Sequence, residues 1–454
     1  MDTFFYKGKE NILATDKIQV IESENDSNLK KIKEAFLKVL DNKNLSFLLG
    51  SGCSSYEIEK VKEEKKEKEY TQIGIPVMAP LAKEFYGLEK FKEAKTWLKD
   101  NLQIDVESKI FATNLETFLS TLHSLSFYHS KIAQQEESVE NDNTEVEIQD
   151  EDLGKSDFEK LNDASKINHI IIEARNFILK KILNEKNVLN KSDESLNKIY
   201  KQFYRKLLSR NSTLPRLNIF TTNYDLYSEK AMDLLGIHYV NGFTGGINKF
   251  FNPTIFNYAL AEKMDLSQSK WSVIDNFFYL YKIHGSINWI EADGENKLFK
   301  VKEIQEPKFT RLKGEATIMI YPTPLKYNAS LGSPYSDLFR EFQRKLMMNN
   351  NILVTIGYSF SDEHINNLIF QAFTIPSFRL IIIGEPTEHN KIGELQKLDD
   401  SRIWIIGEKF PQDNEHYVPL HFFKRFVDEI LPDLTNEDLD EKLENTIKKL
   451  FNKE

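Results

Sequence analysis

The stretch IFTTNYDLYSEK, residues 219–230, has the pattern of a strand that ends in polar side chains. Its apolar start at 219–220 runs directly into Thr-Thr-Asn-Tyr-Asp at 221–225. Hydroxyl, amide and carboxylate groups at the end of a buried strand favour contact with water or a ligand. In α/β sheets, such strand ends commonly form a binding site, so the rest of the sequence has to identify that site.

Several other short apolar runs share this pattern. They are LSFLLG (45–50), LNIFTT (217–222), YLYKIH (279–284), ILVTIG (352–357), RLIIIG (379–384) and RIWIIG (402–407), with TIMIYPT (317–323) as a seventh candidate. Near-continuous apolar runs of this length are typical of strands covered on both faces. Helical patterns such as DEHINNLIFQAF (362–373) separate several of them. The alternation predicts an α/β fold with a doubly wound, Rossmann-like, mostly parallel sheet.

One interval between strands is far longer than a simple crossover. Residues 114–133 and 167–185 within it have helical apolar spacing, and the acidic segment 134–152 between them is predicted to be a loop. The charged run EIEKVKEEKKEKEY (57–70) is expected to be a solvated loop or helix face. The predicted organisation is therefore an N-terminal segment (1–44), a Rossmann-like domain (45–54 and 215–430), a helical insertion (55–214) and a C-terminal helix (431–454).

Composition narrows the class of protein. The formal net charge of −10 gives no general attraction to nucleic acid, and the single cysteine, Cys53, excludes both a disulfide framework and a four-cysteine zinc site. The histidine spacings match no zinc pattern, so no metal is expected. No apolar run of 18 residues and no signal-like N-terminus occur, so we expect a cytoplasmic protein with no membrane contact.

Polar or small residues follow five of the predicted strands. They are Gly50, Ser51, Gly52 and Ser54 after the first, Asn223 and Asp225 after the second, His284 and Gly285 after the third, Gly357 and Ser359 after the fourth, and Gly384 and Glu385 after the fifth. Ligands of open α/β sheets bind outside the carboxyl ends of the strands. These residues therefore predict one shared crevice.

Each motif also has a purely structural interpretation. The glycines at 50 and 52 suit close backbone approach to a diphosphate, but they also suit a plain tight turn. A histidine at a strand end is often a hydrogen-bonded structural residue. Asn223 and Asp225 are equally candidate caps for the helix at 225–235, and Ser359 and Asp362 have the same ambiguity before the helix at 362–373.

Taken together and in this order, the motifs resemble the sirtuin family of NAD-consuming enzymes. GSGCS (50–54) is similar to the glycine-alanine-glycine-x-serine loop, TTNYD (221–225) to the threonine-glutamine-asparagine-x-aspartate motif, and KIHGS (282–286) to the catalytic histidine-glycine strand. IGYSFSD (356–362) and IIIGEP (381–386) resemble the later strand ends that hold the adenosine side of NAD.

The departures from the sirtuin pattern are informative. Zinc-containing sirtuin deacylases carry four cysteines that this chain lacks, and the Gln of the family motif is Thr222 here. A Gly-Ile-Pro triplet occurs at 74–76, but a charged run separates it from the first glycine loop. GYSFSDEHI (357–365) resembles more closely the sirtuin-like NAD hydrolases of bacterial antiphage defence.

The resemblance implies roles for individual residues. Asn223 would hold water or the nicotinamide ribose, His284 would be the general base, and Asp225 would orient the ribose or stabilise its positive charge. A further set would bind NAD as the substrate: Gly50, Ser51, Gly52, Ser54, Thr222, Gly285, Gly357, Ser359 and Glu385. Histidine suits proton transfer near neutral pH.

The function predicted from the sequence is regulated NAD hydrolysis that depletes NAD during infection, giving nicotinamide and ADP-ribose. The resemblance also implies a homo-oligomer, with a HerA-type ATPase or a phage-derived activator as partner. A non-catalytic sensor of an NAD-derived nucleotide and an NAD-dependent protein deacylase stay open as alternatives. A nuclease is disfavoured by the charge.

Overall fold

The computed structural model describes residues 3–13, 24–61, 68–137, 158, 160–183, 194–262, 273–292, 301–312, 317–319, 333–411 and 417–433. All structural statements refer to these ranges. The predicted C-terminal helix from 434 onward, the acidic segment beyond residue 137 and the last residues of the 317–323 candidate strand lie outside them.

A nine-stranded sheet forms the centre of the molecule, in the order β2-β1-β16-β15-β14-β3-β6-β10-β7. Its strands are β1 (Thr3–Lys7), β2 (Glu10–Asn11), β3 (Asn44–Leu49), β6 (Asn218–Thr221), β7 (His238–Val240), β10 (Phe277–Lys282), β14 (Asn351–Ile356), β15 (Arg379–Ile383) and β16 (Ile403–Glu408). The strands from β16 to β7 pair in parallel, while β1 runs antiparallel to β16. The α/β, doubly wound architecture predicted from the sequence is confirmed, and all six apolar runs lie in this sheet.

Side chains alternate between the two faces of the sheet, and each face has its own core. Phe47 and Leu49 of β3 pack into one core, whereas Leu48 packs into the other. The first core includes helices α1 (Glu24–Leu40), α7 (Glu194–Leu208) and α8 (Tyr227–Leu234), together with α14 (Phe423–Arg425) and η5 (Phe426–Ile430). The second includes α11 (Tyr335–Leu346), α12 (Glu363–Ala372) and α13 (Lys391–Lys397). Burial on both faces explains why the strands lack a polar alternation.

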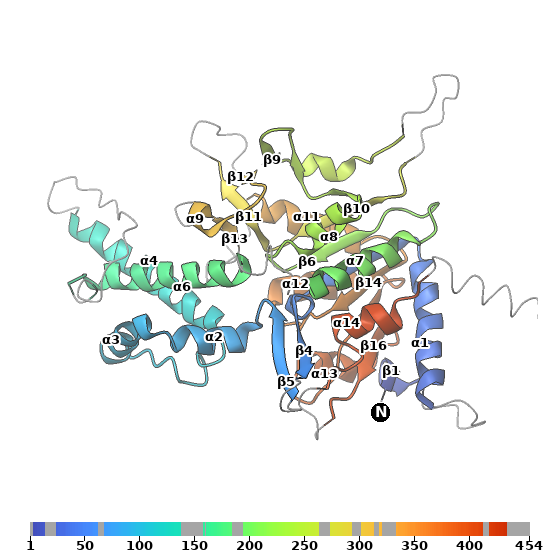
Figure 1. The fold of residues 1–454 in the computed structure, drawn as a ribbon, viewed down its shortest axis with the longest axis horizontal. Coiled ribbons are helices and arrows are strands. Elements are labelled where there is room, and N and C mark those ends of the chain that lie inside the picture. The colour runs from blue at the N-terminus through green and yellow to red at the C-terminus, as the bar shows by residue number, and fades with distance from the viewer. Residues whose placement is uncertain are drawn as a thin grey trace, which may run out of the picture.

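A second, antiparallel sheet lies beside the first (Figure 1). It contains β13 (Thr317–Met319), β11 (Gly285–Glu291), β12 (Val301–Glu303), β9 (Lys249–Phe251) and β8 (Phe243–Thr244), in that order. The short segments η4 (Pro253–Asn257) and α9 (Phe309–Leu312) accompany it. The seventh candidate strand is thus a strand, but it belongs to this sheet.

Helices between β3 and β6 form a bundle to the left of the main sheet in Figure 1. They are α2 (Met78–Tyr86), η2 (Glu89–Phe91), α3 (Lys92–Leu102), α4 (Leu115–Glu137) and α6 (Asp163–Leu183). They share a core of their own, centred on Phe85, Phe118 and Ile170. The helices expected at 114–133 and 167–185 are present as α4 and α6. By contrast, α7 packs its Tyr200 and Phe203 against the main sheet.

Residues 57–61 and 68–70 of the charged run are not the loop or helix face that the sequence suggested, and residues 62–67 lie outside the described ranges. The described part belongs to an antiparallel hairpin of β4 (Ser55–Val61) and β5 (Lys68–Gly74), with Ser55 paired to Gly74. The prediction was wrong because a high density of charged residues does not prevent two segments from pairing as strands. Apolar residues at the base, Tyr56 and Ile73, are buried in the main core and anchor the hairpin.

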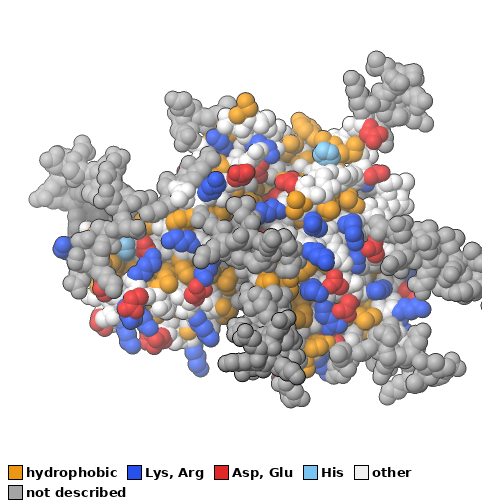
Figure 2. Space-filling model, in the orientation of Figure 1, with side chains coloured by type: hydrophobic (Ala, Val, Ile, Leu, Met, Phe, Trp, Pro, Cys, Tyr) orange, Lys and Arg blue, Asp and Glu red, His pale blue; other side chains and the backbone are white. Residues whose placement is uncertain are grey.

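None of the described helices is long and apolar enough to span a bilayer. On the face shown in Figure 2, Lys and Arg side chains are interspersed with Asp and Glu side chains. The net charge of −10 gives no general attraction to nucleic acid.

Candidate active site

A cavity of about 570 Å³ lies at the carboxyl ends of the central strands. The loops after β3, β6, β10 and β14 form its polar side and contribute Ser51, Ser54, Thr222, Asn223, Tyr224, Asp225, His284, Gly357, Tyr358, Ser359, Ser361 and Asp362. Its volume lies within the usual range for small-molecule sites. The crevice predicted from the strand ends therefore exists, built by four of the five loops.

Close packing of two loops explains the first glycine pair. A Cβ atom on Gly50 would lie 2.3 Å from the carbonyl oxygen of Gly357, and one on Gly52 would lie 2.9 Å from the Gly357 Cα. Gly357 itself has φ +61°, a conformation that favours glycine. The three glycines thus let the loops after β3 and β14 meet at the cavity floor.

The backbone donors of the first glycine loop are largely used within the protein. The N–H groups of Gly50, Gly52, Cys53 and Ser54 donate to the carbonyl oxygens of Ile356, Gly357, Gly50 and Ser51, over 2.9–3.1 Å. In this state those donors do not point at a ligand. The diphosphate role suggested for this loop therefore stays a prediction, with the Ser51 side chain as its contribution to the cavity wall.

Asn223, Ser54 and Asp225 form one buried hydrogen-bond network. The Asn223 Nδ2 atom donates to the Gly50 carbonyl oxygen and to Ser54 Oγ, both over 2.8 Å. Ser54 Oγ in turn donates to Asp225 Oδ2 over 2.5 Å. Because both amide protons of Asn223 are used, its Oδ1 atom is the one left to accept a bond from water or a substrate hydroxyl.

Asp225 contacts the start of α8 and also lies at the cavity wall. Its Oδ1 atom accepts from the Tyr227 N–H over 3.1 Å at the start of α8, as a local cap does. Its Oδ2 atom belongs to the Ser54 network at the cavity wall. A bond to the start of α8 and a place at the cavity wall are therefore compatible for Asp225, although the N-cap position itself is Leu226.

A buried lysine supports the loop that carries these residues. Lys282, at the end of β10 and 1% exposed, donates to the carbonyl oxygens of Tyr224 and Asp225. Its Nζ also lies 3.0 Å from Glu229 Oε1 on α8. Burial raises the pKa of Glu229, and the Lys282 ammonium opposes that shift. Lys282 and Glu229 therefore help to hold the loop of Tyr224 and Asp225 in place.

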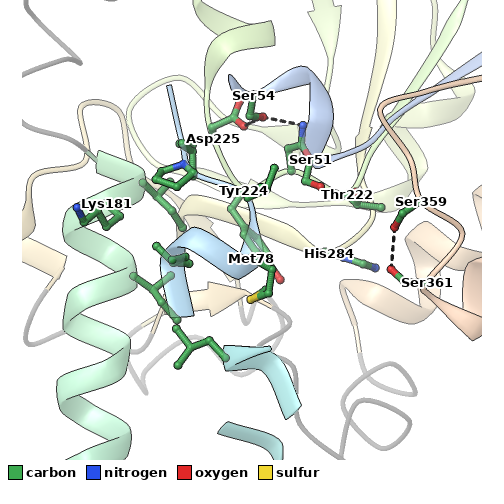
Figure 3. Close-up of a pocket in the computed structure, with 18 of the residues that line it drawn as sticks. Ser51, Ser54, Met78, Lys181, Thr222, Tyr224, Asp225, His284, Ser359 and Ser361 are labelled. Atoms are coloured by element: carbon green, nitrogen blue, oxygen red, sulfur yellow. Dashed lines mark hydrogen bonds between the residues drawn. The ribbon is translucent and has the colours of Figure 1, made fainter. Parts of the chain in front are cut away.

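His284 follows β10 and Asp362 lies in the segment after β14, and their side chains lie close together at the cavity. The imidazole Nε2 lies 3.0 Å from Asp362 Oδ2, and both side chains are about one-tenth exposed. Asp362 Oδ1 also caps α12, accepting from the N–H groups of His364 and Ile365 over 3.0 and 3.4 Å. Figure 3 shows His284 beside the Ser359 and Ser361 hydroxyls, which hydrogen bond to each other.

The hairpin returns the Gly-Ile-Pro triplet to the glycine loop. The Ile75 N–H donates to the Ser54 carbonyl oxygen over 2.9 Å. Gly74 has φ +86°, and a Cβ atom there would lie 2.1 Å from the same oxygen. Ile75 and Pro76 consequently line the cavity, although about 20 residues separate them from Ser54 in the sequence.

The helical bundle supplies the apolar side of the cavity. Its contributions come from the segment leading into α2, from the start of α4 and from the end of α6: Ile75, Pro76, Val77, Met78, Leu81, Asn114, Leu115, Thr117, Leu119, Ser120, Ile178, Lys181 and Ile182. Met78 and Lys181 lie on this side in Figure 3. The Lys181 ammonium pairs with Glu84 on α2. A ligand would thus be held between polar loops and an apolar helical wall.

The sequence-predicted residues divide into three groups by position. Asn223, Asp225, His284, Ser51, Ser54, Thr222, Gly357 and Ser359 line the cavity. Gly50 and Gly52 shape its floor. Gly285 and Glu385 do not line it, and the Glu385 carboxylate instead accepts from the Phe410 N–H over 3.3 Å.

Sequence reasoning missed three features of the site. It did not foresee the contact of Asp362 with His284, the support of the loop by Lys282, or the apolar wall from the helical bundle. A polar residue in an otherwise apolar strand was the available signal for Lys282. The other two features depend on tertiary packing, for which the sequence has no local signature.

Two further observations concern the cysteine and the candidate metal ligands. Burial raises the pKa of the Cys53 thiol well above its ordinary value, so this cysteine is not a ready nucleophile. Within the described ranges, no group of three or more His, Cys, Asp or Glu residues could hold a metal ion. The groups placed at the cavity are suited to proton transfer and to binding hydroxyls.

Comparison with known proteins agrees with this arrangement. Residues 217–391 match the family model of the SIR2-like domain. No curated protein matches the chain. The matched segment contains Asn223, His284 and Asp362, whereas the first glycine loop precedes it. Residues 217–391 are thus similar to the SIR2-like domain, and this similarity suggests NAD-related activity.

Proposed function

We propose that this protein hydrolyses NAD at the nicotinamide–ribose bond, giving nicotinamide and ADP-ribose. The observation that carries the proposal is the placement of Asn223 and His284 on one cavity, within a segment similar to SIR2-like domains. The apolar wall next to these polar groups suits a flat aromatic ring beside a ribose.

The leaving group makes modest demands on the enzyme. Nicotinamide departs as a neutral molecule from a cationic pyridinium, so it needs no proton from a general acid. Positive charge develops on the ribose, as in glycoside hydrolysis. The protein must therefore hold the ribose and a water molecule, accept a proton and stabilise positive charge.

The cavity residues can meet these demands. Asn223 Oδ1 accepts a hydrogen bond from the attacking water or from a ribose hydroxyl. His284 takes the proton. The buried carboxylate of Asp225, held by Ser54, favours the positive charge that develops on the ribose. The hydroxyls of Ser51 and Ser359 are available for the remainder of the dinucleotide.

Direct measurement of nicotinamide release tests the proposal. Purified protein is incubated with NAD, and nicotinamide is separated by chromatography, for the wild type and for Asn223→Ala and His284→Ala. We expect each substitution to lower turnover by about 10²-fold or more. His238→Ala, an exposed histidine on β7, is the matched control and should keep full activity. NAD binding without any nicotinamide release would favour a sensor instead.

We further propose that the activity belongs to a cytoplasmic antiphage system that depletes NAD in infected cells. The similarity of GYSFSDEHI (357–365) to such proteins supports this role. An NAD-depleting enzyme must be restrained in healthy cells, and assembly into an oligomer or with a HerA-type ATPase or a phage-derived activator is the proposed control.

The NAD content of infected cells that express the wild type or Asn223→Ala tests the role. Activity measured across size-exclusion fractions tests control by assembly, which full turnover by a dilute monomer would contradict.

A further inference from the structure

We infer that Asp362 is a positioning residue that holds His284 in a single tautomer. One oxygen of its carboxylate lies 3.0 Å from His284 Nε2, while the other accepts from the backbone at the start of α12. The inference rests on the proposed function only for its effect on turnover. The inferred placement of the proton on the imidazole is based on the 3.0 Å distance between His284 Nε2 and Asp362 Oδ2.

An ionised carboxylate can only accept hydrogen bonds. The atom that faces it, His284 Nε2, must therefore carry a proton when the ring is neutral. The lone pair of the ring then lies on Nδ1, and this nitrogen becomes the base. Because His284 itself lines the cavity, its orientation and tautomer decide which atom can receive a proton from water or a ribose hydroxyl.

The cap of α12 prevents Asp362 from turning away. Its Oδ1 atom is held by the N–H groups of His364 and Ile365, so Oδ2 has a fixed direction toward the imidazole. The same helix start thus orients the carboxylate and, through it, the ring. Asp362 therefore caps α12, as the sequence suggested, and it also orients His284.

This geometry makes Asp362→Asn an unusually clear test. Asn caps helices as well as Asp does, and the cap requires its oxygen to face the backbone N–H groups. The amide NH₂ must then face His284 Nε2 as a donor. Nε2 becomes an acceptor, and the proton of the neutral ring moves to Nδ1, which is the opposite tautomer.

The experiment records ¹⁵N NMR spectra of the histidine side chains in the full-length protein, with His284 assigned by difference from His284→Gln. We expect the wild type to show the Nε2–H form and Asp362→Asn the Nδ1–H form, with an unchanged melting temperature. Turnover of NAD should fall about 10²–10⁴-fold, the usual contribution of a positioned general base, because the wrong tautomer of a catalytic histidine is a poor base. Retention of the Nε2–H form by Asp362→Asn would overturn the inference.

A second variant separates the cap from the contact. Asp362→Ser keeps a good cap but is too short to reach the imidazole, so it should keep the melting temperature and lose the single tautomer. An unchanged tautomer in this variant would also overturn the inference. Absence of nicotinamide release by the wild type would refute the proposed function alone, because the spectra still report on the tautomer.

Discussion

The Ile75 N–H donates to the Ser54 carbonyl oxygen over 2.9 Å, so the chain leaves the cavity wall at Ser54 and returns to the same point. The hairpin between them closes on its own base, where Ser55 pairs with Gly74. The cavity wall is therefore continuous across an insertion, and the body of the hairpin is an addition to it.

Shortening the hairpin should leave the site intact. Replacing residues 58–71 by Asn-Gly keeps the pair of Glu57 with Gln72 and offers a favoured two-residue turn. We expect the free energy of unfolding to change by less than about 1 kcal/mol and nicotinamide release to persist. Ile73→Ala, at the buried base, is the contrasting control and should cost about 2–5 kcal/mol. Lost activity in a stable shortened protein would show that the hairpin acts in the site.

A methyl group at position 50 should separate the loops that form the cavity floor. Gly50→Ala places a Cβ atom 2.3 Å from the Gly357 carbonyl oxygen, and backbone on both sides leaves little room to adjust. We expect a loss of about 1–3 kcal/mol in the free energy of unfolding, as for other overpacked sites, together with weaker NAD binding in titration calorimetry. Gly246→Ala, which meets no atom within 4 Å, is the matched control. Equal behaviour of the two variants would contradict the loop contact.

Removing Lys282 from its ion pair with Glu229 should lower the free energy of unfolding. Lys282→Met leaves the Glu229 carboxylate buried without its cation, and two loop carbonyls lose their donor. We expect a loss of about 3–5 kcal/mol in the free energy of unfolding by urea. Lys282→Met combined with Glu229→Gln should recover part of this loss, because no unpaired buried charge remains. A double variant as unstable as the sum of the single variants would show that the pair is not coupled.

The central sheet could be predicted from the sequence because its strands are short, apolar and buried on both faces. Residues such as 352–356 and 379–383 show this pattern locally. Strands β1 and β7 were not predicted, since strands of five and three residues with partly exposed side chains have a weaker pattern. The charged hairpin was misjudged for a related reason: its pairing depends on two segments matching each other rather than on either one alone.

The candidate site could be predicted only where its residues end strands. Asn223, Asp225 and His284 were found in this way, and they line one cavity. Glu385 also follows a strand, but its carboxylate bonds to the 410 backbone instead. The apolar wall came from helices whose approach to the sheet depends on tertiary packing, such as that of Leu179 against Ile287. The sequence of α6 contains no local pattern that predicts this contact.

A buried histidine should make the protein sensitive to mild acid. Burial lowers the pKa of His421 from its ordinary 6.5 to about 4, and its Nδ1 atom accepts from the Glu408 N–H over 3.5 Å. Between these two pH values the unfolded chain binds a proton that the folded protein does not. This histidine therefore favours unfolding increasingly as the pH falls from about 7 toward 4.

The size of this effect follows from the two pKa values. At pH 5 the contribution of His421 to the free energy of unfolding should be about 2 kcal/mol lower than at pH 8. Urea unfolding of the wild type and of His421→Gln at both pH values isolates it, because all other titrating groups are common to the two proteins. We expect the wild type to lose about 2 kcal/mol more than the variant on going to pH 5. Equal losses would mean that His421 becomes protonated in the folded protein as readily as in the unfolded chain, and hence that the segment around it opens to solvent before global unfolding.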